Sequence, residues 1–213
     1  MGLIDVFYPK ICVGCSRQGE YICQDCQRKL RKPEDICPQC CKPSLDGRVH
    51  ARCRYKYGMD GLVVGLPYRG MVQQCLKKVK YKSAWDIVKF LFDLSNFELS
   101  SDYIVTSVPM WRKKERERGF NQAKILAQIV AKQLDFEEID LLERVRSTRP
   151  MFGLKKPDRL ANVDGAFRLI KKPANQRIIL VDDVWTTGAT MRECAKILKH
   201  GGAKVVWGLA LAR

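Results

Sequence analysis

The sequence lacks any hydrophobic run close to the ~18 residues that a membrane-spanning helix needs. Its first residues show neither the basic segment nor the apolar core of a secretory signal. Val6 also stands where a myristoylation signal requires Ser or Thr. These absences predict a cytoplasmic protein without membrane insertion. The 213 residues, 46% hydrophobic and 29% charged, have the balance of a folded globular chain and not of a disordered or fibrous one.

Acidic residues are scarce relative to basic ones. The chain has 23 Asp and Glu against 39 Lys and Arg, which gives a formal net charge of +16 at pH 7. Such an excess suits a polyanionic partner, whether nucleic acid, a phosphate-rich small molecule or an anionic membrane surface. The plainer alternative is a generally basic protein. Zinc sites built from thiolates would also lower the net charge.

Cysteine is abundant and unevenly distributed, with eight of the ten residues in the first 53 positions. In a cytoplasmic chain this density predicts metal binding, because disulfides are rare there. Three C-x2-C pairs and one H-x2-C pair supply two tetrahedral sets of zinc ligands. Sharing of ligands between pairs, or one zinc with the other cysteines merely buried, stays open. The simplest partition is Cys12, Cys15, Cys23 and Cys26 for one site, and Cys37, Cys40, His50 and Cys53 for the other.

Residues 1–57 are therefore predicted to form a cysteine-rich zinc-binding module with a short helix over 23–30. This segment has few apolar residues, so zinc binding would supply the missing folding free energy. The module could bind nucleic acid or protein, or act only as a structural cap. Cys41 is predicted to be a bystander, because it adjoins Cys40 and its side chain should point elsewhere.

Residues 58–213 are predicted to form an α/β domain with a mainly parallel sheet and helices on both faces, because strands alternate with helices. Cys75 and Cys194 fall within helices and are expected to be core residues. The sequence predicts strands over 61–68, 103–108, 177–181 and 205–211, and helices over 71–81, 84–94, 121–134 and 189–199, with Asn121 as an N-cap.

The most specific stretch of the chain covers residues 178–190. Four apolar residues form a buried strand, which the adjacent carboxylates Asp182 and Asp183 follow. Ligands of open parallel sheets bind at that end of the strands. A loop with hydroxyl groups and Gly188 then leads into a helix, whose amino end and backbone N–H groups can hold a phosphate. The pattern suits a ribose 5-phosphate.

This stretch resembles the phosphoribosyl-pyrophosphate (PRPP) binding motif of type I phosphoribosyltransferases. The resemblance implies that Asp182 and Asp183 are the catalytic-site carboxylates and bind the ribose hydroxyls. It assigns the 5′-phosphate to the loop residues Thr186, Thr187, Gly188, Ala189 and Thr190.

The arrangement of the whole chain is similar to the ComF family, which includes proteins of the ComFC and GntX type. The cysteine pairs precede the phosphoribosyltransferase-like domain, and Arg118-Gly119-Phe120-Asn121-Gln122 and Asp158-Arg159-Leu160-Ala161-Asn162 fit the family pattern. Two departures stand out. The family often has a C-x2-C pair where this chain has His50 and Cys53, so His50 must substitute. It also often has Gln in the loop near Thr148, where this chain has Met151.

Basic clusters fit the same ligand. By the same resemblance, a loop that contains Arg112 and Arg118 would hold the pyrophosphate half of PRPP. A second stretch, which includes Arg149, Lys155, Lys156 and Arg159, could act as a flap over the site. Both clusters could instead be a solvated basic surface. Trp111 and Trp185 could stack on a base, but packing is the commoner role of an aromatic residue beside a loop.

Two function hypotheses follow. The ComF resemblance implies a PRPP-binding protein that acts in DNA uptake during natural transformation, with a helicase-like protein as partner. The charge excess and the basic cluster over 112–118 favour single-stranded DNA as a further partner. The alternative is a metabolic phosphoribosyltransferase with a structural zinc cap, which would transfer the phosphoribosyl group from Mg²⁺-bound PRPP to a nucleobase or amine. The resemblance to transferases alone does not establish turnover.

Overall fold

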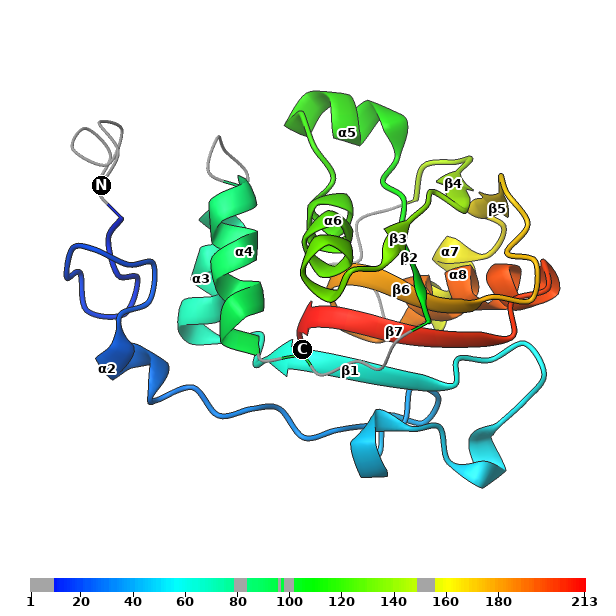
Figure 1. The fold of residues 1–213 in the computed structure, drawn as a ribbon, viewed down its shortest axis with the longest axis horizontal. Helices are drawn as coiled ribbons and strands as arrows, with labels where there is room; N and C mark the ends of the chain where they lie inside the picture. The colour runs from blue at the N-terminus through cyan, green and yellow to red at the C-terminus, as the bar shows by residue number, and fades with distance from the viewer. Residues whose placement is uncertain (1–9, 79–83, 96, 98–101, 149–155) are drawn as a thin grey trace.

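The computed structural model describes residues 10–78, 84–95, 97, 102–148 and 156–213 (Figure 1). Within these ranges, five strands form one sheet in the order β1-β7-β6-β2-β3, and every neighbouring pair is parallel. A separate antiparallel pair joins β4 and β5. The strands are β1 (Gly61–Leu66), β2 (Ile104–Ser107), β3 (Glu137–Glu138), β4 (Leu142–Arg144), β5 (Phe167–Leu169), β6 (Arg177–Val184) and β7 (Val205–Ala212).

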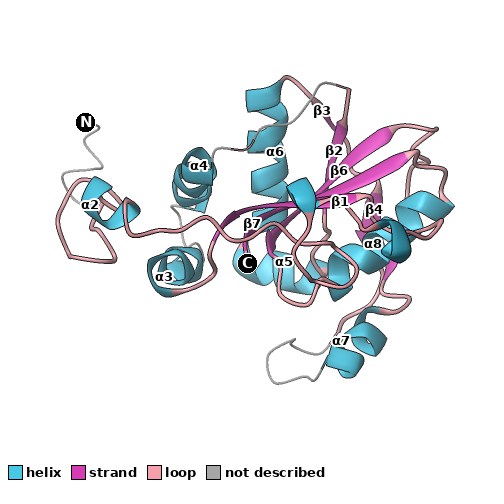
Figure 2. Cartoon of the chain, turned by 90° about the horizontal axis from the view of Figure 1, so that it is seen from below, coloured by secondary structure: helices cyan, strands magenta, loops and turns pink. Residues whose placement is uncertain are grey.

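Helices cover both faces of the sheet, as predicted (Figure 2). One apolar core lies between the sheet and the helices α3, α4 and α6. A second core lies on the opposite face, where α8 packs with the β4–β5 pair. The helices are α2 (Gln24–Gln27), α3 (Gly70–Lys78), α4 (Ala84–Ser95), α5 (Arg112–Arg118), α6 (Gln122–Leu134), α7 (Lys156–Val163) and α8 (Ala189–His200), with 3-10 turns η1 (Leu45–Gly47) and η2 (Ala51–Cys53).

The elements with clear apolar periodicity form where the sequence predicts them. The predicted strands become β1, β2, β6 and β7; β1 ends two residues earlier and β6 three residues later than predicted. The end of the predicted helix 71–81 lies outside the described residues. Asn121 caps α6, because its side chain accepts a hydrogen bond from the backbone N–H of Ala123 at 3.1 Å. Cys75 and Cys194 are buried core residues, as predicted. No helix within the described ranges has both the length and the apolar character needed to cross a membrane.

The first cysteine segment, residues 12–26, packs beside α3 and α4 (Figures 1 and 2). Gly14 approaches α3 so closely that a Cβ there would lie 2.4 Å from the sulfur of Met71. Cys75 of α3 faces the backbone carbonyl of Tyr21 at 3.9 Å, and the rings of Tyr21 and Phe90 meet edge to face at 5.7 Å. The contact between this segment and the helices is therefore mainly one of side-chain packing.

The second cysteine segment, residues 37–53, lies along the edge strand β1. Arg48 and Gly61 form an antiparallel bridge, and the N–H of Val49 donates to the carbonyl of Asp60 at 3.0 Å. Gly47 has φ +69, and a Cβ there would lie 1.9 Å from the carbonyl oxygen of Leu62. The backbone of this segment thus covers an edge that would otherwise be open to pairing.

Candidate functional site

The polar groups of the site gather where β2 and β6 end. These strands are parallel neighbours, so their carboxyl ends meet at one edge of the sheet. The N–H of Val108, just past β2, donates to the carbonyl of Val181 in β6 at 2.9 Å. Asp182 and Asp183 lie in the last residues of β6, so the predicted carboxylates stand at the carboxyl edge as expected.

A cavity of about 220 Å³, here called the Asp182 cavity, opens at this edge. It joins the two carboxylates with Thr190 at the start of α8 and with cationic side chains from α5 and β4. Its lining residues are Val108, Pro109, Met110, Lys114, Arg118, Asn121, Gln122, Ala123, Arg144, Asp182, Asp183 and Thr190.

The environment of Asp182 strongly perturbs its carboxyl group. Desolvation within the fold and the adjacent Asp183 carboxylate together raise its pKa well above the ordinary value, although the N–H of Asp183 donates to its Oδ1 at 2.9 Å. An ionised Asp182 is thus destabilised in the free protein. Donor groups of a ligand, such as ribose hydroxyls, would relieve this cost.

Arg144 is the functional candidate that the sequence analysis missed. Desolvation lowers the pKa of its guanidinium, and its Nε is buried without a hydrogen-bond partner. The guanidinium lies 5.4 Å from the ring centroid of Phe167 and also bonds to Thr148. It reaches the Asp182 cavity from β4, a three-residue strand with no sequence signal of its own. A half-buried cation with a spare buried donor is well suited to an anionic ligand.

The hydroxyl-rich loop 185–190 leads from β6 into α8. Gly188 is the N-cap residue of α8 with φ +73, a conformation that glycine adopts readily. Thr186 is exposed and Thr187 half-buried, and of the five predicted phosphate residues Thr190 alone lines the Asp182 cavity. Trp185 is only 2% exposed, which confirms a packing role.

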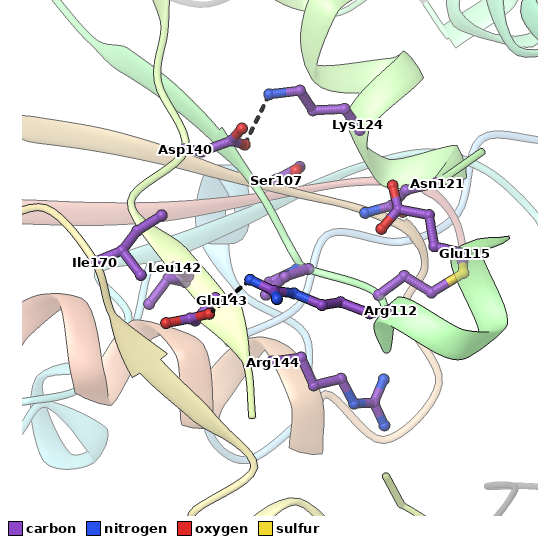
Figure 3. A pocket seen from close by; sticks show the side chains of 12 residues that line it. Ser107, Arg112, Glu115, Asn121, Lys124, Asp140, Leu142, Glu143, Arg144 and Ile170 are labelled. Carbon is purple, nitrogen blue, oxygen red and sulfur yellow. Dashed lines mark hydrogen bonds and ion pairs between the residues drawn. The ribbon is translucent and has the colours of Figure 1, made fainter. Parts of the chain in front are cut away.

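Figure 3 shows a second cavity, of about 240 Å³ and here called the Asp140 cavity. It shares Pro109, Met110, Asn121 and Arg144 with the Asp182 cavity. Ion pairs cross it: Lys124 pairs with Asp140 at 2.7 Å and Arg112 with Glu143 at 3.5 Å. Because most of these charges are already matched, this cavity is less suited to a free anion than its neighbour.

The segment predicted as a pyrophosphate loop is a helix instead. Residues 112–118 form α5, which ends at Gly119 in the left-handed conformation. Arg, Lys and Glu all favour helices, and Arg116 and Arg118 in the last turn stabilise the negative end of the helix dipole. The loop before it, at Pro109 and Met110, lies between the two cavities.

The arginines predicted to bind PRPP consequently lie in different places. Arg118 lines the Asp182 cavity and donates to the side chain of Gln122 at 3.2 Å. Arg112 faces the Asp140 cavity, with its side chain 80% exposed. Arg159 lies on α7, and its side chain is outside the described part of the chain, as are Arg149, Met151 and Lys155.

The eight predicted zinc ligands come together in two groups that match the simplest partition. Within each group, the ligand atoms all lie within 4.8 Å of one another. The first group is Cys12, Cys15, Cys23 and Cys26, and the segment 12–26 that carries it is here called the first ribbon. The second group is Cys37, Cys40, His50 and Cys53, and the segment 37–53 is the second ribbon.

The first ribbon has the electrostatics of a thiolate site. Burial would raise the pKa of Cys12, but backbone hydrogen bonds led by those from Cys23 and Gly14 outweigh it and lower the pKa to about 6. Burial and the neighbouring sulfur atoms raise the pKa of Cys26 to about 12. Four sulfur atoms this close need a cation to become thiolates together, which fits zinc.

The second ribbon prepares His50 as a ligand. The Nε2 of His50 lies 2.9 Å from the carbonyl oxygen of Pro43, so Nε2 carries the proton and Nδ1 keeps its lone pair. That Nδ1 lies 3.4 Å from the sulfur of Cys40 and 4.0 Å from that of Cys53. His50 thus occupies the place of the missing cysteine. Cys41 is turned out of the cluster, as predicted for a bystander.

Comparison with known proteins agrees with this arrangement. Residues 121–212 match the phosphoribosyl transferase domain, and residues 3–54 match the double zinc ribbon domain. The DNA utilization protein YhgH of Salmonella typhi is 31% identical over 205 residues, and that of Escherichia coli (strain K12) is 29% identical over 204; each match covers 90% of both chains. Competence protein F of Haemophilus influenzae is 29% identical over 214 residues, which cover 95% of this chain and 90% of the relative.

Proposed function

The chain belongs to the ComF family of competence and DNA utilization proteins, and on this premise we propose that it acts in the cytoplasm in DNA uptake, through a domain that binds PRPP or ribose 5-phosphate. The proposal keeps the division into a zinc module, residues 1–57, and a phosphoribosyltransferase-like domain, residues 58–213. A helicase-like protein is the expected partner.

The Asp182 cavity is the observation that carries the ligand assignment. It presents two carboxylates for ribose hydroxyls, and Thr190 with the amino end of α8 for the 5′-phosphate. Arg118, Lys114 and Arg144 line the same space and would bind the pyrophosphate. Mg²⁺ would enter with the pyrophosphate and neutralise part of its charge.

Each ribbon is proposed to bind one zinc ion through its four clustered ligands. The donor set fits zinc, which takes four S or N ligands in a tetrahedron. Single-stranded DNA is proposed as a further partner, because α5 exposes basic residues on a chain whose net charge is +16.

Titration calorimetry with PRPP and Mg²⁺ tests the ligand. The wild type should bind, and Asp183→Asn should lose ten- to hundred-fold in affinity, equivalent to about 1.5–3 kcal/mol for a charge-assisted hydrogen bond. Asp93→Asn, which removes an exposed carboxylate on α4, is the matched control and should bind normally. No heat at millimolar PRPP in a folded protein would overturn the ligand assignment.

A transformation assay tests the cellular role. A naturally transformable host that lacks its own relative should regain DNA uptake with the wild-type gene and with Asp93→Asn, but not with Asp183→Asn. If transformation is normal without the gene while labelled PRPP is converted to a nucleotide or ribosylamine, the metabolic alternative is correct.

A further inference from the structure

A side chain of the phosphate-binding helix contacts the second ribbon directly. Arg192 lies in the first turns of α8, and its Nε donates to the carbonyl oxygen of Pro38 at 2.6 Å. Its Nη2 donates to the sulfur of Cys41 at 3.2 Å. Pro38 stands between the zinc ligands Cys37 and Cys40, so Arg192 bonds directly to the loop that carries these two cysteines.

The same guanidinium packs on the hydroxyl-rich loop. Its Cζ lies 5.4 Å from the ring centroid of Trp185, the first residue of that loop. The indole in turn lies against Gly188, where a Cβ would stand 2.2 Å from the ring carbons. The N–H of Arg192 also donates to the carbonyl of Gly188 at 2.9 Å. Contacts therefore run without a break from the cysteine loop 37–40, through the Arg192 guanidinium and the Trp185 indole, to the backbone of loop 185–190.

Packing alone holds the indole in place. Trp185 is almost fully buried, yet its Nε1 makes no hydrogen bond. The ring contacts both the guanidinium and Gly188 within the core that α8 forms with the sheet, so a fixed guanidinium restricts the ring and the loop backbone beside it. A planar guanidinium with two acceptors in one segment is well fixed, because little freedom remains once both bonds form.

We infer that Arg192 is a positioning residue through which the folded second ribbon holds loop 185–190 in its ligand-binding shape. The inference rests on the proposed function for the identity of the ligand, but the coupling between ribbon and loop is independent of it. The first ribbon has no such role, because it packs in the core on the opposite face of the sheet from α8.

Hydrogen exchange measured on the peptide 185–192 tests the coupling without any ligand. In Arg192→Met, which removes the guanidinium and keeps an unbranched apolar side chain, the protected amides of Trp185 and Arg192 should exchange about tenfold faster through local opening. Lys196→Met, one turn further along α8 and half exposed, is the matched control and should exchange like the wild type. Zinc content should be two equivalents in both variants.

Ligand binding gives a second readout. Affinity for ribose 5-phosphate should fall about three- to tenfold in Arg192→Met and stay unchanged in Lys196→Met. If the wild type does not bind ribose 5-phosphate, the proposed function fails, while the exchange rates still decide whether the coupling exists.

Single ligand substitutions separate the two ribbons. Cys40→Ser should lose one zinc equivalent and accelerate exchange in 185–192, whereas Cys15→Ser should lose one equivalent without changing that peptide. The effects of Cys40→Ser and Arg192→Met should not add, because both act on one contact. Wild-type exchange in Arg192→Met, or equal effects of Cys15→Ser and Cys40→Ser on the loop, would overturn the inference.

Discussion

The two ribbons have similar ligands and different neighbours. Each brings four donor atoms within 4.8 Å, and in each the first cysteine has a lowered pKa, because backbone N–H groups outweigh its burial. The first ribbon rests on α3 and α4 through side-chain packing, whereas the second shares backbone hydrogen bonds with β1 and reaches α8 through Arg192. Ligand chemistry alone therefore does not define the role of a ribbon; the element that it touches does.

Removal of a zinc site should have the largest effect and should distinguish the ribbons. Cys12→Ser with Cys15→Ser, or Cys37→Ser with Cys40→Ser, should each lose one of two zinc equivalents and unfold its ribbon, since structural zinc contributes roughly 10–16 kcal/mol of apparent binding free energy. Elemental analysis measures the zinc, and calorimetry measures the stability of the remainder.

The second pair should also lower the melting temperature of the α/β domain, by roughly 4–8 °C for about 2 kcal/mol lost at β1. The first pair should lower that transition by less, because only its side-chain packing on α3 and α4 is lost. Equal losses from both pairs would show that the ribbons stabilise the domain alike, and a wild type purified without chelator and without zinc would contradict both site assignments.

A glycine in each ribbon gives a matched comparison of backbone contact. Gly47→Ala should destabilise the protein by roughly 2–4 kcal/mol, because it adds strain at φ +69 to an overlap with the Leu62 carbonyl. Gly19→Ala in the first ribbon should cost only about 1 kcal/mol, since its Cβ would meet nothing within 4 Å. Urea unfolding measures both, and equal losses would mean that the contact with β1 contributes nothing.

The elements predicted from the sequence are those whose residues carry their own signal. Apolar runs predicted β1, β6 and β7, apolar periodicity predicted α6 and α8, and pairs of ligands predicted both ribbons in the observed partition. The carboxylates Asp182 and Asp183 were placed correctly because their strand is buried on both faces, so its end marks the sheet edge.

The missed elements depend on tertiary contacts. Strand β3 consists of two glutamates that pair with β2 and has no apolar pattern. Strand β4 brings Arg144 to the cavity by pairing with β5, over 20 residues away, which local periodicity cannot reveal. The sequence predicts a loop where helix α5 forms, because these residues have no apolar face, although their helix propensity is high.

Asp182→Asn should weaken ligand binding in the Asp182 cavity and leave both ribbons unchanged. PRPP affinity should fall ten- to hundred-fold, because a neutral amide accepts weaker hydrogen bonds from the ribose than a carboxylate does. Zinc content should remain at two equivalents, and exchange in 185–192 should be unchanged.

The same substitution should stabilise the free protein. The raised pKa of Asp182 means that the folded state favours the protonated acid, so stability is lost as the pH rises from the unfolded value of about 3.9 through the folded pKa. Asn removes this loss, and the melting temperature at pH 7 should rise by about 2–4 °C per kcal/mol recovered. A lower melting temperature in the variant would contradict the assigned cost of the carboxylate.

The smallest expected effect concerns where single-stranded DNA binds. If five phosphates are neutralised, the logarithm of the affinity should fall with the logarithm of the salt concentration at a slope of roughly −3.5. Lys113→Gln with Arg116→Gln removes two exposed cations of α5 that line neither cavity, so the slope should become less steep by about 1.4. Arg31→Gln with Lys32→Gln removes two exposed cations from the segment between the ribbons and is the matched pair. Anisotropy titrations from low to moderate salt measure both slopes. A change of slope confined to the α5 pair places the DNA strand beside the Asp182 cavity. A change confined to the other pair places the strand along the ribbons and contradicts the role given to α5. A flat salt dependence in the wild type rules out DNA binding through phosphate contacts.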